Sequence, residues 1–266
     1  MRIAFLQLRP ERGAPDANLS TAERALGGAR LDLVVLPELV LTGYLFRGRA
    51  EAFALADTVP GRATEALAAL CARGGFHVVA GLAEREAGRL FNSAVLVGPG
   101  GLVARYRKAH LFHDEKRIFD PGDTGFEVHP VGEARVGMLI CFDWMFPEAA
   151  RSLALAGADV VAHPSNLVLP HAQDAVTTRC IENRFYWILA NRTGSEREGD
   201  LDLSFTGRSR IVGPDGCVLD EAGPDEDRLG TVEVDPARAR DKRVTPRNDL
   251  LEDRRPALYE RLTRRT

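Results

Sequence analysis

Short apolar runs alternate along most of the chain with segments that have helical amphipathic spacing. The run LDLVVLPE is apolar almost throughout, which is typical of a buried strand. The segment GRATEALAALCARGG repeats apolar residues every three or four positions and ends on glycine, as helices do. We predict strands over residues 2–8, 31–38, 76–84, 90–98, 102–108, 135–140, 159–165 and 186–192, with a further hairpin over 207–222. We predict helices over residues 17–30, 61–75, 147–158 and 172–185.

This alternation of strands and helices, with added hairpins, indicates an α/β fold. The 266 residues contain no repeat, low-complexity tract or linker, so we expect a single domain over residues 1–266. Residues 109–126 have no clean period and are rich in polar and turn residues. We therefore expect a long ordered loop there, of the kind that often carries function.

Charge and cysteine usage narrow the classes of partner. The 35 basic and 38 acidic residues leave a formal charge of −3, with no block of like charge except a short basic tail. We expect neither nucleic acid nor a membrane as a partner, since no apolar run approaches the ~18 residues of a membrane span. The start of the chain is typical of a first strand rather than a signal peptide. The four cysteines form no C-x-x-C pair, which argues against a disulfide framework or a zinc site and favours a cytoplasmic location.

Three chemically active side chains follow predicted strands. Cys141 ends an apolar run just before a helix that begins at Pro147, where α/β sheets build their clefts. Glu38 and Lys108 close two other predicted strands. Taken singly, Cys141 fits a buried structural thiol and Glu38 fits a cap on backbone N–H groups. Together they indicate one cleft that holds an acid, an amine and a thiol.

The segments around these residues resemble the signatures of a known family. LPELVLTGY (36–44), YRKAHLF (106–112) and ICFDWMFPE (140–148) are similar, in this order, to the three signature segments of the nitrilase superfamily of carbon–nitrogen hydrolases. The resemblance extends from about Ile3 to Arg255. It implies a four-layer α-β-β-α sandwich that pairs into an αββα–αββα homodimer through the helices next to the cysteine and the ENR segment.

The resemblance also implies roles for individual residues. Glu38, Lys108 and Cys141 correspond to the catalytic triad, and Glu115 matches a second glutamate seven positions after the lysine. Cys141 would attack an amide carbonyl while Glu38 moves protons. Lys108 and the backbone N–H of Phe142 would hold the oxyanion. Glu115 would position Lys108 or the substrate nitrogen, although an exposed charge in HDEKR remains an alternative.

Further residues carry weaker expectations. The candidates for the substrate pocket are Tyr44, Asp143, Trp144 and Asn166. A structural role is the alternative for Asp143, core packing for Trp144 and turn formation for Asn166. Arg179 and Glu182 have the helical spacing of a structural ion pair. We expect the remaining cysteines to pack in the interior; they are Cys71, Cys180 and Cys217. A Cys-His mechanism through His110 or His113 is disfavoured, because the Glu-Lys pattern already accounts for activation of the thiol.

The preferred reading is an amidase that acts on a small linear amide. Hydrolysis of N-carbamoyl amines is the first alternative, and nitrile hydrolysis is less favoured because FDW after the cysteine differs from the W-E-N usual in nitrilases. A glutamine amidotransferase lacks support, since its G-x-C-x-G elbow is missing. A non-catalytic, nitrilase-like interaction protein is disfavoured because every triad residue is present. No cofactor or metal motif occurs in the sequence.

Overall fold

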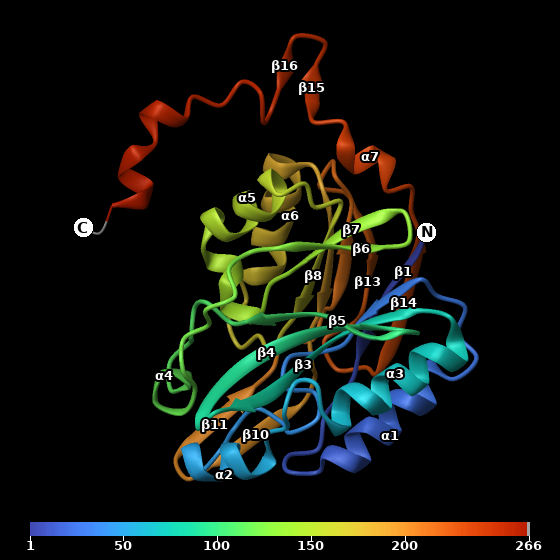
Figure 1. Cartoon of the computed structure of the whole chain (residues 1–266), viewed down its shortest axis with the longest axis vertical. Coiled ribbons are helices and arrows are strands. Elements are labelled where there is room, and N and C mark those ends of the chain that lie inside the picture. Colours follow the sequence, from blue (N-terminus) through green and yellow to red (C-terminus); the bar gives the residue numbers. More distant parts are fainter. Residues whose placement is uncertain (265–266) are drawn as a thin grey trace.

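The computed structural model describes residues 1–264 and contains two six-stranded mixed sheets (Figure 1). In the first sheet three central strands run parallel, and the outer strands are antiparallel to their neighbours. Its strands in spatial order are β14 (Arg228–Glu233), β1 (Arg2–Gln7), β2 (Leu33–Val35), β3 (His77–Glu86), β4 (Arg89–Gly98) and β5 (Gly101–Arg107).

The second sheet repeats this plan, with a parallel centre and antiparallel flanks. Its strands in spatial order are β13 (Val218–Glu221), β12 (Arg210–Val212), β9 (Tyr186–Ala190), β8 (Val160–Pro164), β7 (Ala134–Met138) and β6 (Val128–Val131). The apolar run ending at Ile140 therefore forms β7, and Cys141 begins a 3₁₀ turn over Cys141–Met145.

Helices cover the outer face of each sheet. Along β1, Ile3 and Phe5 join a core shared with the second sheet, whereas Ala4 and Leu6 pack with residues of α1 (Pro15–Leu26) and α3 (Arg62–Gly74). This period of two follows from the alternation of side chains along a strand. Helices α5 (Pro147–Leu155) and α6 (Ala172–Asn183) cover the second sheet. The predicted four-layer α-β-β-α sandwich is confirmed.

The predicted elements form, but their ends and the smaller elements differ from expectation. The strand predicted over residues 31–38 ends at Val35, so Glu38 lies in the turn beyond it. The helix predicted to reach residue 30 ends at Leu26, because two glycines follow. The unpredicted elements are short or polar: α2 (Arg49–Leu55), α4 (Glu115–Ile118), α7 (Ala237–Arg240), β6, β10 (Ser195–Glu198), β11 (Leu201–Ser204), β14, β15 (Arg243–Thr245), β16 (Asn248–Asp249) and 3₁₀ turns at Pro256–Leu258 and Glu260–Thr263.

Within residues 1–264, every helix is too short or too polar to cross a bilayer.

Gly81 of β3 lies directly against the turn that carries Glu38. A Cβ at Gly81 would lie 2.4 Å from the Cα of Glu38 and 2.7 Å from the backbone nitrogen of Leu39. The two segments are also joined by hydrogen bonds, from the Gly81 N–H to the Pro37 carbonyl (3.1 Å) and from the Val40 N–H to the Gly81 carbonyl (3.0 Å). Only glycine permits this approach, so Gly81 helps to set the position of Glu38.

We predict that Gly81→Ala lowers the free energy of unfolding by about 1–3 kcal/mol, because the new methyl group meets backbone that cannot rotate away. Denaturant unfolding of the wild type and the variant measures this loss. Gly100→Ala is the matched control, since a Cβ at Gly100 meets no atom within 4 Å. Equal stabilities of the two variants would contradict the prediction.

Candidate active site

Glu38 is fully buried in the turn after β2. Its Oε1 accepts hydrogen bonds from Lys108 Nζ (2.6 Å) and from Asn92 Nδ2 (2.7 Å). Its Oε2 is buried and has no hydrogen-bond partner among residues 1–264. One oxygen of this carboxylate is thus fixed, while the other is free to accept a proton.

Lys108 follows β5 and lies between two buried carboxylates. Its Nζ is 2.6 Å from Glu38 Oε1 and 2.7 Å from Glu115 Oε1. Burial acts to lower the pKa of Lys108, but Glu115 and Glu38 outweigh it, so the pKa is raised above its ordinary range. The amine is therefore held as an ammonium ion at neutral pH.

Glu115 is the first residue of α4, inside the predicted loop, and it is buried. This placement contradicts the alternative of an exposed charge. Its Oε1 accepts the Tyr44 hydroxyl (2.8 Å), and its Oε2 accepts the Phe112 backbone N–H (3.1 Å). Burial raises the pKa of Glu115, with Glu38 adding to the effect and Lys108 opposing it.

Cys141 follows β7 in the left-handed region, with φ of 41°. A non-glycine residue adopts this conformation only where its surroundings enforce it. The Sγ lies 3.8 Å from the Asn166 carbonyl oxygen and is buried. Burial raises the pKa of the Cys141 thiol well above its ordinary range; Glu38 raises it further, and Lys108 opposes. The thiol is therefore neutral in the free protein and needs a base.

Asp143 supports the cysteine turn from within. Its carboxylate accepts hydrogen bonds from the Tyr106 hydroxyl (2.8 Å) and from the Ile140 N–H (2.9 Å), and it contacts His110 Nδ1 at 2.7 Å. Asp143 is fully buried and lines neither of the cavities described below. Of the two roles expected for Asp143, these internal partners fit the structural one, because they occupy its carboxylate.

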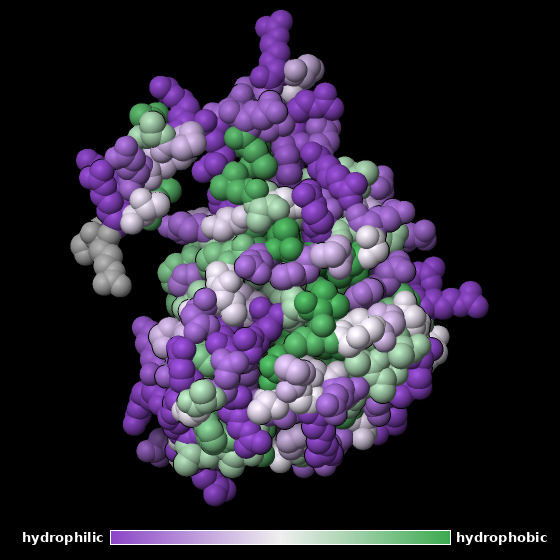
Figure 2. All heavy atoms as spheres, viewed as in Figure 1, coloured by the Kyte–Doolittle hydropathy of each residue, from purple (hydrophilic) through white to green (hydrophobic). Residues whose placement is uncertain are grey.

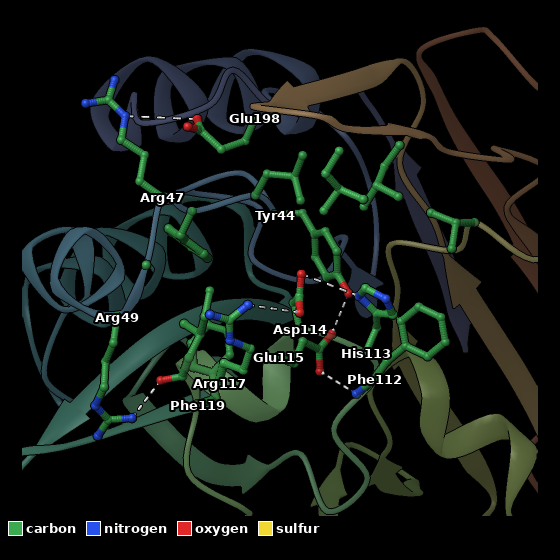
Figure 3. A pocket seen from close by; sticks show the side chains of 17 residues that line it. Tyr44, Arg47, Arg49, Phe112, His113, Asp114, Glu115, Arg117, Phe119 and Glu198 are labelled. Carbon is green, nitrogen blue, oxygen red and sulfur yellow. Dashed lines mark hydrogen bonds and ion pairs between the residues drawn. The ribbon is translucent and has the colours of Figure 1, made fainter.

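Two neighbouring cavities adjoin these residues. The larger, of about 470 Å³, is bounded on one side by Tyr44 and Glu115, whose side chains point toward each other in Figure 3. The smaller, of about 10 Å³, lies against Cys141 and is lined by Trp144 and Asn166. Cys141 does not line the larger cavity. The two cavities share Phe112 and Val168, which form the boundary between them.

Comparison with known proteins identifies the family. Residues 2–244 match the carbon–nitrogen hydrolase family, and a nitrilase from Pyrococcus abyssi (strain GE5 / Orsay) is 45% identical over 265 residues, which are 98% of this chain and 100% of that protein. The chain belongs to the carbon–nitrogen hydrolase family. An (R)-stereoselective amidase from Pseudomonas sp is 38% identical to this hydrolase over 240 residues, 88% of this chain and 85% of the amidase. A solved mutant of the amidase from Nesterenkonia sp. AN1 has a TM-score of 0.80 at 28% identity, and covers 98% of this chain and 96% of that one.

Some residues of this hydrolase site were missed by sequence reasoning. Asn92 holds Glu38, and Glu196 of β10 accepts the backbone N–H groups of Tyr44 (3.0 Å) and Leu45 (2.7 Å). Asn92 has a detectable signal, because it is a polar residue within the apolar strand LFNSAVLV. Glu196 has none, since it lies in the polar segment SEREGD and reaches the site only through the fold.

The predicted ion pair, the remaining cysteines and the possible metal ligands can now be placed in the fold. Arg179 and Glu182 form the predicted ion pair, with 3.0 Å between Nη1 and Oε1. Cys71 and Cys180 are buried as expected, but Cys217 is exposed at the hairpin turn, so its expected packing role is wrong. Within residues 1–264, no group of three or more His, Cys, Asp and Glu side chains is arranged to hold a metal ion.

His163 of β8 is buried beside the cysteine turn, and its hydrogen bonds fix its protonation. Trp187 Nε1 can only donate, and it lies 3.1 Å from His163 Nδ1, which must therefore accept. The ring proton is then on Nε2, which lies 2.9 Å from the Cys141 carbonyl oxygen and donates to it. Burial lowers the pKa of His163 from 6.5 to about 4. Protonating Nδ1 would also place two donors face to face.

We predict that His163 makes the fold sensitive to acid between pH 6.5 and about 4. The unfolded chain binds a proton on this histidine as the pH falls through 6.5, whereas the folded chain binds it only near pH 4. His163 therefore lowers the free energy of unfolding by about 3 kcal/mol as the pH falls through this window. Below about pH 4 its contribution no longer changes with pH. Denaturant unfolding at about pH 7 and about pH 4.5 measures the loss. His163→Gln should lose less over the same interval, and an equal loss would contradict the assignment.

Proposed function

We propose that this carbon–nitrogen hydrolase is an amidase that forms a thioester on Cys141. In the first half-reaction Glu38 accepts the thiol proton while Sγ bonds to the amide carbonyl carbon. The oxyanion is stabilised by Lys108 and by the Phe142 N–H. The C–N bond then breaks, and the proton on Glu38 passes to the nitrogen, which leaves as ammonia or an amine.

In the second half-reaction water takes the place of the amine. Glu38 accepts a proton from this water while the water oxygen bonds to the thioester carbon. The C–S bond breaks, Glu38 returns the proton to sulfur, and the acid leaves. Glu38 thus alternates between base and acid, while Lys108 stays charged throughout.

The observation that carries this proposal is the unpartnered Oε2 of Glu38. Because the raised pKa of Cys141 keeps the thiol neutral, attack requires a carboxylate oxygen that is free to take the proton. Lys108 cannot take it, since Glu38 and Glu115 keep the amine protonated. In the Nesterenkonia amidase a solved mutant carries the acetamide moiety of fluoroacetamide on the active-site cysteine, which supports a nucleophilic role for Cys141 here.

The surroundings of Cys141 favour a small amide as substrate. Asn166 is buried and lines the small cavity, and both its side-chain nitrogen and oxygen lack partners among residues 1–264. A free donor and acceptor suit a carboxamide group, which presents the complementary pair. The narrow space beside Cys141 admits only a slim group at the reacting end, and the adjoining cavity offers about 470 Å³ for the rest of the acid. Nitrile hydrolysis is the second candidate, because the Pyrococcus abyssi relative is called a nitrilase.

We predict that the purified enzyme releases ammonia from at least one aliphatic amide faster than from the matching nitrile. The panel should contain amides, ω-amides, N-carbamoyl amines and nitriles. Cys141→Ala should abolish release, Glu38→Gln should be nearly as damaging, and Lys108→Met should lower kcat on the order of 10²-fold or more.

Arg179→Gln is the control variant, because it removes an ion pair of α6 that takes no part in the proposed mechanism. This variant should keep the activity of the wild type. Near-normal turnover in Glu38→Gln would show that another residue acts as the base. Faster ammonia release from nitriles than from every amide would contradict the amidase proposal and indicate a nitrilase instead.

The thioester itself can be trapped with hydroxylamine. Substrates that share one acyl group and differ in the leaving amine pass through one acyl-enzyme, so they should all give the same ratio of hydroxamate to acid. Ratios that change with the leaving group would instead indicate direct attack by water.

We also propose a homodimer, on the basis of exposed apolar residues. Leu155 of α5 and Ile181 of α6 are 48% and 52% exposed, and Leu258 and Leu262 near the C-terminus are 65% and 66% exposed. Figure 2 shows the C-terminal segment standing off the body of the molecule, with hydrophobic residues on its surface. Such groups are typical of surfaces that a second copy covers.

We predict the mass of a dimer, or of a dimer-based assembly, by light scattering. Ile181→Glu should shift the mass toward the monomer, because a charge would be buried at the contact. Val103→Glu is the control, since Val103 is 42% exposed on β5 of the first sheet, outside the two helices and the C-terminal segment. A monomer mass at all concentrations would contradict the dimer.

A further inference from the structure

His163 contacts the backbone of Cys141 and takes no part in the chemistry proposed above. It is fully buried in β8, with its Nε2 2.9 Å from the Cys141 carbonyl oxygen and 3.3 Å from Ser165 Oγ. Trp187, itself fully buried, donates to Nδ1 and packs edge-on against the ring, with 5.2 Å between ring centroids. The imidazole is thus held in one orientation and one tautomer.

The carbonyl that His163 holds belongs to the peptide that joins Cys141 to Phe142. A trans peptide is planar, and its C=O and N–H point in opposite directions. A donor that fixes the Cys141 oxygen therefore also fixes the direction of the Phe142 N–H, which faces away from His163. Among residues 1–264 no acceptor is found for that N–H.

We propose that His163 is a positioning residue that orients the Cys141–Phe142 peptide so that the Phe142 N–H meets the oxyanion. The inference rests on the proposed function, which assigns the oxyanion to this N–H. It adds a residue that touches neither the substrate nor the reacting sulfur.

The backbone of Cys141 supplies the reason for such a restraint. Its φ of 41° is costly for a residue with a side chain, so the turn would relax unless neighbouring groups held it. Asp143 holds one side through the Ile140 N–H (2.9 Å), and His163 holds the other through the Cys141 carbonyl. A histidine that only filled the core would need no donor aimed at this carbonyl, and an aliphatic side chain would serve.

The test uses two reagents that react with the same sulfur, one through an oxyanion and one without it. With p-nitrophenyl acetate, Sγ bonds to the ester carbonyl carbon, an oxyanion forms, Glu38 takes the thiol proton, and p-nitrophenolate leaves. With iodoacetamide, Sγ bonds to the methylene carbon and displaces iodide, Glu38 takes the thiol proton, and no oxyanion forms. In His163→Leu the rate of Cys141 acetylation should fall on the order of ten- to a hundred-fold, while the rate of alkylation stays within about three-fold of the wild type.

His163→Gln is the conservative variant, because its amide can place an N–H near the position of Nε2. It should recover most of the acetylation rate lost in His163→Leu. The same pattern should appear with the best amide of the panel, as a lower kcat with a KM within about two-fold of the wild type.

Three results would overturn the inference: an unchanged acetylation rate in His163→Leu, a parallel loss of acetylation and alkylation, or no recovery in His163→Gln. Mass spectrometry locates both adducts on Cys141, and circular dichroism compares the folds of the variants. A wild type that hydrolyses no amide would count against the proposed function alone, because the comparison of the two reagents uses no amide substrate.

Discussion

The contact on which the rest of the site depends is the ammonium of Lys108 between the carboxylates of Glu38 and Glu115. Burying an isolated charge costs several kcal/mol or more, so the ammonium can stay charged in the interior only because the two carboxylates lie beside it. Lys108 in turn opposes the rise in the pKa of Glu115 that burial and Glu38 cause. The lysine also occupies Oε1 of Glu38 and leaves Oε2 without a partner. The ion pairs therefore offset the free-energy cost of burying these charges. They also leave one oxygen of Glu38 available for its proposed role as a base. Replacing either glutamate would change both properties at once.

The fold supplies Glu38, Lys108 and Cys141 from three separated points. Glu38 follows β2 and Lys108 follows β5 in the first sheet, while Cys141 follows β7 in the second. The two sheets share one core, so the ends of strands from different sheets can meet at its edge. Around each group the backbone is fixed by packing: Gly81 lies against Glu38, and a Cβ at Gly122 would lie 2.1 Å from the Arg107 carbonyl oxygen, beside Lys108. Close backbone packing thus sets the positions of Glu38 and Lys108.

The sequence was sufficient to predict the residues that stand at strand ends and insufficient for those that reach the site from elsewhere. Apolar runs locate β2, β5 and β7, and the polar residue that follows each run is visible in the sequence. Glu196 was missed, because it accepts the backbone N–H groups of Tyr44 and Leu45 from more than 150 positions away. Tyr44 and Glu115 were named through the family resemblance, but their hydrogen bond across 71 positions depends on how α4 folds back, which no local pattern specifies. Asp143 shows a second limit. Its place next to Cys141 left a pocket wall and a structural role open, and only the fold shows that its carboxylate turns inward to Tyr106 and His110. Adjacency in the sequence does not determine on which side of a tight turn a side chain lies.

The raised pKa of Cys141 distinguishes this site from those that store a thiolate. Cysteine nucleophiles next to a cation or a helix N-terminus are often ionised before substrate arrives, because positive charge lowers the thiol pKa. Here Lys108 acts in that direction, yet burial and Glu38 outweigh it. A buried thiolate beside two carboxylates would add a third negative charge around a single ammonium. In the proposed mechanism the proton therefore leaves sulfur as the new bond to carbon forms, when Glu38 is neutralised and the negative charge moves onto the carbonyl oxygen. Such coupling makes the geometry of the oxyanion donors, and of the peptide between Cys141 and Phe142, decisive for the first step.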